Sequence, residues 1–260
     1  MSSKDKLKRF AENETFSCLL QPRTDEVLGC DHPIKGNWGR DMFGNDNPIV
    51  LELGCGRGEY TIALAEKFPE KNFIGIDIKG ARLWRGSKYA TEHNMPNVAF
   101  LRTRIEFIES LFAEGEVTEI WITFADPQEK KPRKRLTAPL FLKRYAHILA
   151  TDGIIHLKTD SRLLHFYTEE VCRQNAMTVI ASDDDIYGHG VADDILSIKT
   201  YYESSFLAKG IAITYIAFKL DNGKSLIEPE WDQEPYEQAY RTDTRRGARD
   251  TFEDLEKATH

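Results

Sequence analysis

Acidic residues and glycines stand together in a pattern that can hold a nucleoside. The stretch "LELGCGRGEY" contains Glu52 and then Gly54, Gly56 and Gly58, and Asp77 follows 19 residues after the last glycine. Glycines allow a tight turn and a close approach of a ligand to the backbone. A carboxylate at the end of the next strand can accept hydrogen bonds from both hydroxyls of a ribose. The spacing therefore predicts a site for a cofactor that contains a ribose, whereas a simple tight turn with a surface acid is the alternative.

The ligand of this turn is expected to be a cation rather than a pyrophosphate. The glycines follow a GxGxG pattern, which differs from the GxGxxG fingerprint of dinucleotide-binding proteins. Glu52 precedes the turn, and an acid suits a ligand with an amino group and a sulfonium. The turn resembles the cofactor loop of class I methyltransferases and favours S-adenosylmethionine. A dehydrogenase that uses NAD is a poor second interpretation.

A second chemical feature is the stretch "FADPQEKKPRKRL" at residues 124–136. It places Asp126 and Pro127 ahead of a cluster of cations in a chain whose formal net charge is -7. Pro127 fixes the local backbone and favours an extended conformation before it. The cluster consists of Lys130, Lys131, Arg133, Lys134 and Arg135. Most charge runs are solvated loops, but cations beside a cofactor crevice are suited to bind the phosphates of a nucleic acid.

Alternating strands and helices are expected to bring both features to one edge of a sheet. The patterns predict strands at 48–53, 72–77, 97–102, 117–124 and 153–158, and late strands at 176–182 and 210–220. They predict helices at 59–68, 81–94, 105–112, 138–150 and 162–175, the last two capped by Thr137 and Ser161. This alternation indicates an α/β fold with a doubly wound, mostly parallel sheet, whose strands end at a common ligand-binding edge.

Composition restricts the class of protein. A chain of 260 residues with 41% hydrophobic and 30% charged residues is typical of a soluble globular protein. No apolar run approaches the ~20 residues that span a bilayer, and no secretory signal is visible. The four cysteines form no CxxC pair and no HExxH is present, so we expect reduced thiols in the cytoplasm and no metal site.

Six motifs in this chain resemble those of bacterial tRNA (guanine-N7)-methyltransferases. They are "RFAE", "VLELGCGRGEYT", "FIGIDIKGARLWRGSK", "FADPQEKKPRKRL", "IIHLKTD" and "TYYE", and they extend over roughly residues 7–220. The resemblance implies a Rossmann-like class I methyltransferase with a seven-stranded sheet and one antiparallel late strand. It implies methyl transfer from S-adenosylmethionine to N7 of a guanine in the variable loop of tRNA, at position 46. The implied partner is tRNA, for a monomer or homodimer without membrane or metal.

The same resemblance implies roles for individual residues. The cofactor would be held by Glu52, Gly54, Gly56, Asp77, Ile105 and Asp126, and the substrate by Lys130, Asp160, Thr200 and Glu203. Two positions depart from the family. Gln128 stands where the family often has tryptophan, and Arg104 stands where it has an acid. The adenine edge would then be read by the backbone at Ile105.

The chemistry of guanine assigns Asp126 a role as the catalytic residue without proton abstraction. N7 has a lone pair and no proton, so alignment and a favourable field are the main requirements. Asp160 or Glu203 can accept hydrogen bonds from guanine N1–H and its amino group. The alternatives are an acid at a helix start for Asp160 and a capping box for Thr200 with Glu203.

Further cations, and two competing functions, complete the expectations. Lys4, Lys6, Lys8, Arg9, Lys79, Arg82, Arg85 and Lys88 either contact phosphates or only confer solubility, and Trp84 and Trp121 are expected in the core. A methyltransferase of adenine amino groups would need a second proline and an aromatic residue after Asp126, and a non-catalytic RNA-binding subunit would not need the glycine turn. We expect an arm at 1–47, the methyltransferase domain at 48–228 and an acidic tail at 229–260, partly helical or disordered.

Overall fold

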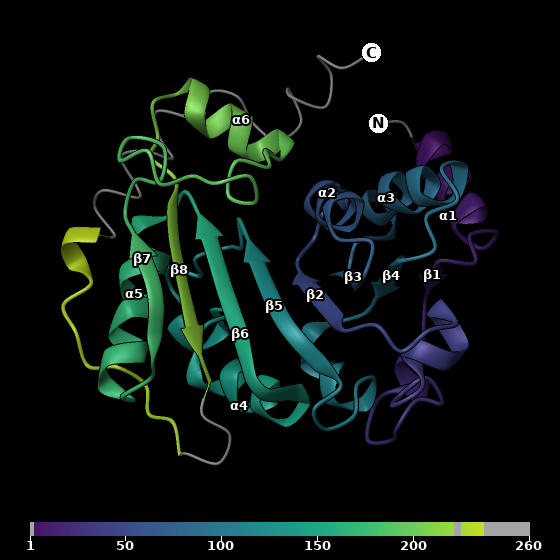
Figure 1. The fold of residues 1–260 in the computed structure, drawn as a ribbon, viewed down its shortest axis with the longest axis horizontal. Coiled ribbons are helices and arrows are strands. Elements are labelled where there is room, and N and C mark those ends of the chain that lie inside the picture. The colour runs from purple at the N-terminus through teal and green to yellow at the C-terminus, as the bar shows by residue number, and fades with distance from the viewer. Residues whose placement is uncertain (1–2, 221–224, 237–260) are drawn as a thin grey trace.

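The computed structural model describes residues 3–220 and 225–236, with side chains from residue 7 onward (Figure 1). At its centre is an eight-stranded sheet with the strand order β1-β4-β3-β2-β5-β6-β8-β7. The strands are β1 (Leu19–Leu20), β2 (Ile49–Leu53), β3 (Asn72–Asp77), β4 (Val98–Arg102), β5 (Val117–Thr123), β6 (Leu149–Thr159), β7 (Val179–Asp183) and β8 (Thr214–Lys219). All neighbouring pairs from β1 to β6 are parallel, and β8 runs antiparallel to β6 and β7.

Helices cover both faces of the sheet. They are α1 (Ser3–Asn13), α2 (Glu59–Lys67), α3 (Gly80–Glu92), α4 (Pro139–Ile148), α5 (Arg162–Gln174) and α6 (Tyr201–Ala208), with short turns η1 (Thr24–Glu26), η2 (Gly39–Phe43), η3 (Ile105–Ser110) and η4 (Pro132–Lys134). One buried cluster joins Leu83 of α3 to Phe100 and Trp121 of the sheet, and a second joins Leu142 of α4 to Ile155. The predicted doubly wound, mostly parallel α/β fold is therefore confirmed.

The sheet has one strand more than expected. Leu19 and Leu20, in the N-terminal arm, pair in parallel with Phe100 and Leu101 of β4. A strand of two residues is too short to show alternation, so sequence periodicity cannot reveal it. The expected reversed late strand is β8, which pairs with β6 from Ile154 to Thr159.

Two of the expected helix caps have different outcomes. Ser161 caps α5 as expected, because its hydroxyl accepts a hydrogen bond from Leu164 N at 3.2 Å. The prediction for Thr137 is wrong. The cap of α4 is Ala138, the helix begins with a proline, and the Thr137 hydroxyl shares a hydrogen bond with Thr168 instead. A proline at the first helical position satisfies the helix start without a side-chain acceptor.

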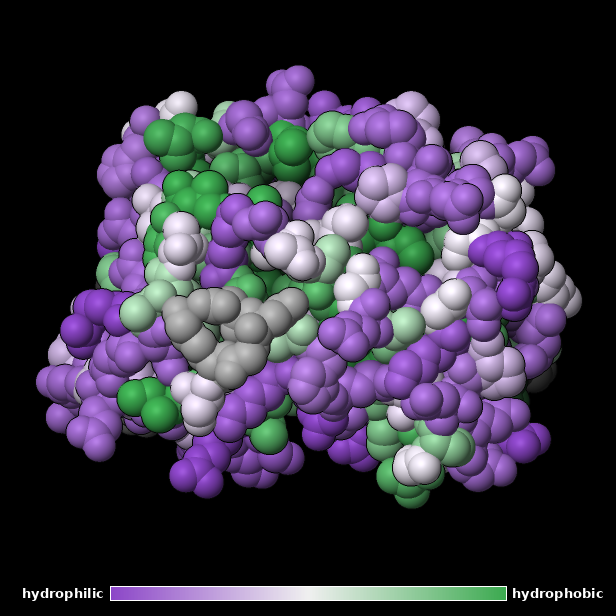
Figure 2. Space-filling model, turned by 60° about the horizontal axis from the view of Figure 1, so that its bottom comes forward, coloured by the Kyte–Doolittle hydropathy of each residue, from purple (hydrophilic) through white to green (hydrophobic). Residues whose placement is uncertain are grey.

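Segments near both ends of the described chain pack against the hydrophobic core. In the arm, Trp38 is fully buried and stacks on Phe112 at 5.2 Å. At the other end, the Tyr167 hydroxyl of α5 donates to Glu228, and Trp231 packs nearby. The expected tail therefore begins with a packed segment, 229–236, and residues 237–260 lie outside the described residues. The end of the molecule opposite α6 is mostly hydrophilic (Figure 2). Within the described part of the chain, no helix combines the length and apolar character of a membrane span.

Candidate active site

The three glycines after β2 have distinct structural roles. Gly54, Gly56 and Gly58 adopt φ angles of 78°, 57° and 75°, a region that favours glycine. A Cβ atom at Gly58 would lie 2.5 Å from the ring of Phe100, so this glycine allows α2 to pack against the sheet. A Cβ atom at Gly54 or Gly56 would have no other described atom within 4 Å. These two positions leave backbone open to a ligand.

Asp77 at the end of β3 connects the glycine turn to the next strand. Its carboxylate is 8% exposed and accepts hydrogen bonds from Gly56 N at 3.0 Å and Lys79 N at 2.7 Å. Each carboxylate oxygen can accept a second hydrogen bond. Asp77 is thus fixed beside the turn and keeps the capacity to bind ribose hydroxyls.

Glu52 lies beneath the turn rather than on its open side. Its Oε2 atom accepts hydrogen bonds from Thr61 N at 2.8 Å and from the Thr61 hydroxyl, and its Oε1 atom accepts one from the Thr123 hydroxyl. Burial raises the pKa of Glu52 to about 7, although the threonine hydrogen bonds oppose this shift. The carboxyl group links the start of α2 to β5. Because Glu52 is buried, it would influence a ligand by the electrostatic effect of its charge and not by direct contact.

A cavity of about 370 Å³ adjoins the ends of β3 and β4. It is lined by residues that include Gln21, Pro22, Ile78, Thr103, Arg104 and Phe107. Ile78 directly follows Asp77 and is 55% exposed, which suits contact with a flat purine ring. Sequence analysis missed Ile78, although an aliphatic residue directly after a strand-ending acid was a visible signal. The cavity, Asp77 and the open glycines together fit the adenosine part of S-adenosylmethionine.

Arg104 stands beside this cavity at the position where the family has an acid, and Ile105 follows it. Ile105 begins η3 and is half-buried against the core. The Arg104 guanidinium pairs with Glu106 at 3.0 Å, so its charge is matched by its own segment. The Arg104 side chain is therefore engaged within its own segment.

The Asp126 loop lies at the carboxyl end of β5. Phe124 has a φ angle of +51°, which is strained for a bulky residue, and its N–H donates to Lys158 O at 2.9 Å. Asp126 is exposed, and its Oδ1 atom accepts a hydrogen bond from Gln128 N at 2.9 Å. The loop therefore presents one carboxylate at the edge of the sheet on which the glycine turn also lies.

The cationic cluster after Asp126 separates into two parts. Lys130, Lys131, Arg133 and Lys134 are exposed. The expectation that Arg135 joins them is wrong, because Arg135 is fully buried. Its Nε atom donates to Pro127 O at 2.8 Å and its guanidinium lies 4.3 Å from the ring centre of Tyr167. Arg135 holds the Asp-Pro turn from below, and four cations face the solvent.

The expected substrate residues come together at the same edge. Asp160 is half-buried at the start of α5. Thr200 caps α6, and its hydroxyl accepts a hydrogen bond from Glu203 N at 3.2 Å. Glu203 does not meet the expectation of an available acceptor, because it is fully buried and pairs with Lys158 at 2.7 Å. The observed hydrogen bond of Thr200 matches the helix-capping alternative. Lys158 is a buried residue beside the site that sequence analysis did not single out.

Comparisons with known proteins show the family to which the chain belongs. Residues 46–216 match the model of a family described as putative methyltransferase. A tRNA (guanine-N(7)-)-methyltransferase of Bacteroides fragilis is 49% identical over 227 residues, which cover 87% of this chain and 90% of that protein. The chain belongs to the tRNA (guanine-N(7)-)-methyltransferase family. A family member from Porphyromonas gingivalis is 55% identical over 205 residues, covering 78% of this chain and 84% of its own.

The fold of this methyltransferase is shared with more distant enzymes. The crystal structure of the 16S rRNA methyltransferase KamB superposes with a TM-score of 0.55 at 13% identity, over 67% of this chain and 88% of that one. The likeness shows a common fold and no more. It confirms the expected Rossmann-like class I architecture.

Lys88, Trp84 and Trp121 are further residues that the sequence brought to attention in this methyltransferase. Lys88 binds Glu12 at 3.1 Å. The expectation that Trp84 lies in the core is wrong, because Trp84 is half-buried and its indole N–H donates to Glu12 at 2.8 Å. Trp121 is buried as expected and stacks on His156 at 4.0 Å. Lys4 and Lys6 lie outside the residues whose side chains are described.

Three possible metal ligands also converge within the described residues, a group that sequence analysis did not anticipate. They are Asp183, Asp184 and His189. Asp183 already pairs with His189 at 3.1 Å, and Asp184 pairs with Arg162. These ion pairs account for the arrangement without an ion.

Proposed function

We propose that this chain transfers the methyl group of S-adenosylmethionine to N7 of a guanine in the variable loop of tRNA, at position 46. The observation that carries the proposal is the exposed Asp126 with four exposed cations, at the sheet edge that also carries the open glycine turn. The relatives at 49% and 55% identity, named for guanine-N7 methylation of tRNA, support it.

The chain's own residues suggest how the cofactor would be held. Gly54 and Gly56 offer open backbone, and Asp77 accepts from the ribose hydroxyls. Ile78 lines the cavity proposed for the adenine, and Glu52 contributes negative charge beneath the turn. The backbone at Ile105, next to the lining residue Arg104, would read the adenine edge. When bound, S-adenosylmethionine supplies a methyl group on a positively charged sulfur.

The target guanine needs positioning more than proton transfer. N7 carries a lone pair and no proton, so no residue has to act as a base. Asp126 would orient the base and stabilise positive charge as it develops on the purine. Lys130, with Lys131, Arg133 and Lys134, would bind the phosphates of a loop nucleotide, and Asp160 and Thr200 would contact the base itself.

The test is transfer of labelled methyl to unmodified tRNA that carries either guanine or 7-deazaguanine in the variable loop. Label on the guanine tRNA alone is expected, because 7-deazaguanine lacks the nucleophilic nitrogen. Equal label on both would move the target atom, and no label on either would refute the proposed reaction.

A matched pair of variants tests the role of Asp126. Asp126→Ala should abolish methylation while S-adenosylmethionine binding, measured by calorimetry, is largely retained. Glu114→Ala removes an exposed carboxylate at the opposite end of β5 and should keep activity. Near-normal turnover of Asp126→Ala would contradict the role.

The setting of this activity is also a proposal. The four cysteines all lie within the described residues and form no disulfide there, which suits a reducing cytoplasm. We propose that the enzyme acts in the cytoplasm as a monomer or homodimer.

A further inference from the structure

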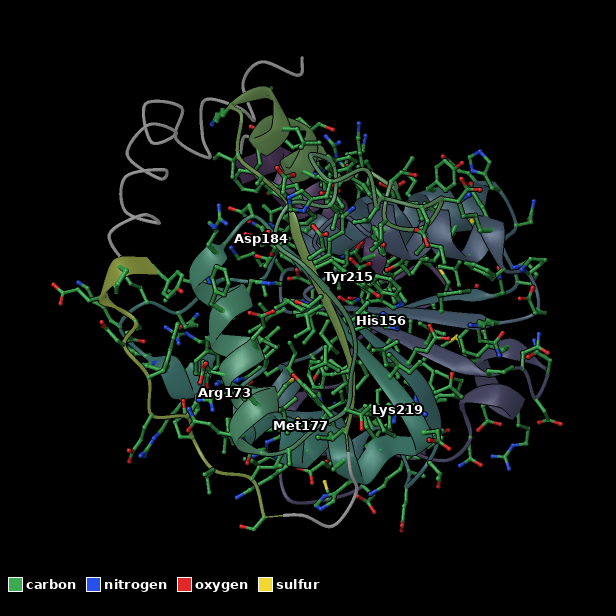
Figure 3. The ribbon with its side chains drawn as sticks, turned by 60° about the vertical axis from the view of Figure 1, so that its left-hand side comes forward. His156, Arg173, Met177, Asp184, Tyr215 and Lys219 are labelled. Carbon is green, nitrogen blue, oxygen red and sulfur yellow. The ribbon has the colours of Figure 1, made fainter. Side chains whose placement is uncertain are left out.

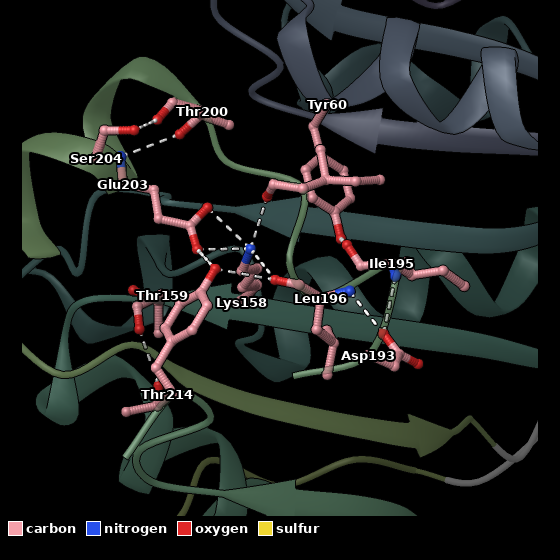
Figure 4. Close-up of polar contacts among 12 residues, drawn as sticks. Tyr60, Lys158, Thr159, Asp193, Ile195, Leu196, Thr200, Glu203, Ser204 and Thr214 are labelled. Carbon is pink, nitrogen blue, oxygen red and sulfur yellow. Dashed lines mark hydrogen bonds and ion pairs between the residues drawn. The ribbon is translucent and has the colours of Figure 1, made fainter. Parts of the chain in front are cut away.

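A buried ion pair lies directly below the substrate side of the site. Lys158 at the end of β6 and Glu203 of α6 are both fully buried, with 2.7 Å between the ammonium and a carboxylate oxygen. The ammonium also donates to Leu196 O at 2.6 Å and to Ile198 O at 2.9 Å. Figure 4 shows Lys158 at the centre of these contacts. The Glu203 carboxylate also accepts from the Tyr187 hydroxyl at 2.7 Å.

Such a pair is a poor device for stability alone. Burial lowers the pKa of Lys158, and the Glu203 carboxylate opposes this shift. The cost of removing two charges from water often equals or exceeds their attraction, so apolar residues of similar volume would stabilise the fold equally well. Removing only one partner is strongly destabilising. We therefore expect the advantage of this ion pair over an apolar pair to lie in fixing the position of α6 relative to β6.

Lys158 touches each segment that carries a proposed substrate residue. Its carbonyl oxygen accepts the hydrogen bond from Phe124 N, two residues before Asp126. Asp160 follows it by two residues in the chain. Its ammonium holds the segment before α6 and the first turn of α6, which Thr200 caps. One side chain and its own backbone thus connect three loops at the site.

The start of α6 is also tied to the cofactor turn. Tyr201 N donates to the Glu59 carboxylate at 2.8 Å, and the Arg57 guanidinium lies 4.6 Å from the Tyr201 ring centre. The Tyr60 hydroxyl donates to Ile195 O at 3.0 Å. Because α2 begins within the glycine turn, these contacts fix α6 relative to the place where the cofactor binds.

We propose that Lys158 and Glu203 are positioning residues, which hold α6 and residues 193–200 over the site so that Thr200 meets the target nucleotide. Glu203 does not itself touch the guanine. The inference rests on the proposed function, since it concerns how the same tRNA is held.

The first test separates positioning from stability. The double variant Lys158→Met with Glu203→Leu replaces the pair by apolar residues. The double variant should fold with some loss of stability, because the Leu196 and Ile198 carbonyls lose a donor. We expect S-adenosylmethionine affinity close to the wild type, with kcat/KM for tRNA lowered about 100-fold, the loss that a displacement of ~1 Å can cause. Wild-type kcat/KM in a folded double variant would overturn the proposal.

A matched control exists on the same sheet. Lys219 and Asp152 form an ion pair of the same length, 2.7 Å, but both side chains are exposed. Lys219 lies near the end of β8 remote from α6 (Figure 3). Asp152 has a φ angle of +65°, which asparagine tolerates, so the control variant is Lys219→Met with Asp152→Asn. It should keep wild-type kinetics, and an equal loss of kcat/KM there would show a general effect of removing ion pairs and overturn the inference.

The second test asks whether Glu203 contacts the base. Glu203→Gln keeps the shape, and inosine at the target position removes the exocyclic amine of guanine. If Glu203 only positions α6, inosine lowers kcat/KM by the same factor in wild type and variant. A penalty that disappears in Glu203→Gln would show direct contact and overturn the inference. Failure of the wild type to methylate guanine tRNA would instead refute the proposed function.

Discussion

Glu52→Gln should reveal how the buried carboxyl group beneath the glycine turn changes stability with pH. Glu52 accepts hydrogen bonds from Thr61 and Thr123, and burial raises its pKa from an ordinary 4.5 to about 7. A raised pKa means that the folded protein favours the protonated form. The protonated Glu52 carboxyl group therefore makes its full contribution to stability below pH 4.5, and this contribution is lost as the pH rises through 7.

The magnitude follows from that interval. At about 1.4 kcal/mol for each pH unit between 4.5 and about 7, the loss is about 3 kcal/mol. Glutamine cannot ionise, and its amide can still bond to Thr61 and Thr123. The difference in free energy of unfolding, Glu52→Gln minus wild type, should consequently increase by about 3 kcal/mol between pH 4.5 and 8.

Urea unfolding of both proteins at pH 4.5, 6, 7 and 8 measures the difference. Glu114→Gln removes an exposed carboxylate and serves as the control. A constant difference in free energy of unfolding between wild type and Glu52→Gln over this range would refute the reasoning.

Calorimetry of S-adenosylmethionine binding over the same pH range adds a functional readout. If the Glu52 charge attracts the cofactor, affinity rises with pH up to about 7 in the wild type and stays flat in the variant.

Two further predictions concern the glycine turn and the cationic cluster. Gly54→Ala should weaken S-adenosylmethionine binding measured by calorimetry. Gly58→Ala should lower the melting temperature further than Gly54→Ala, since both positions have positive φ angles but only Gly58 faces a ring at 2.5 Å. Equal losses of melting temperature would contradict this division. Lys134→Ala should reduce the salt dependence of tRNA binding by about one unit of slope, while Arg135→Met should lower kcat and melting temperature and leave that slope unchanged. Filter binding at several salt concentrations measures the slope for each variant. A changed slope for Arg135→Met would show that the Arg135 guanidinium contacts the RNA.

The parts of the fold that follow local periodicity could be predicted from the sequence. The strands at 49–53 and 72–77 and the helix between them form as expected, because an apolar run, glycines and a helical pattern all agree locally. Asp77 beside the turn follows from the same register. The two-residue β1 has no periodic signal, and the cap of α4 was displaced by one residue because Pro139 starts the helix without an acceptor.

The destinations of single charged side chains could not be predicted, because they depend on tertiary packing. Arg135 stands in an unbroken run of basic residues, and nothing in the run distinguishes it from Lys134. Burial against Tyr167 and the Pro127 carbonyl decides its position. Glu203 likewise has the spacing of a helix cap or of a substrate acceptor. Only the approach of Lys158 from β6 shows where its carboxylate lies.

Both charged motifs of this site therefore depend on a buried support. In "FADPQEKKPRKRL", Asp126 and four cations are exposed, while Arg135 holds the turn that presents them. In "TYYE", Thr200 is 8% exposed and caps the helix at the site, while the fully buried Glu203 anchors that helix to the sheet. A buried charge that loses its partner costs more than an exposed one. Substitutions in the exposed parts should consequently change tRNA affinity and its salt dependence, and substitutions in the supports should change turnover and stability together.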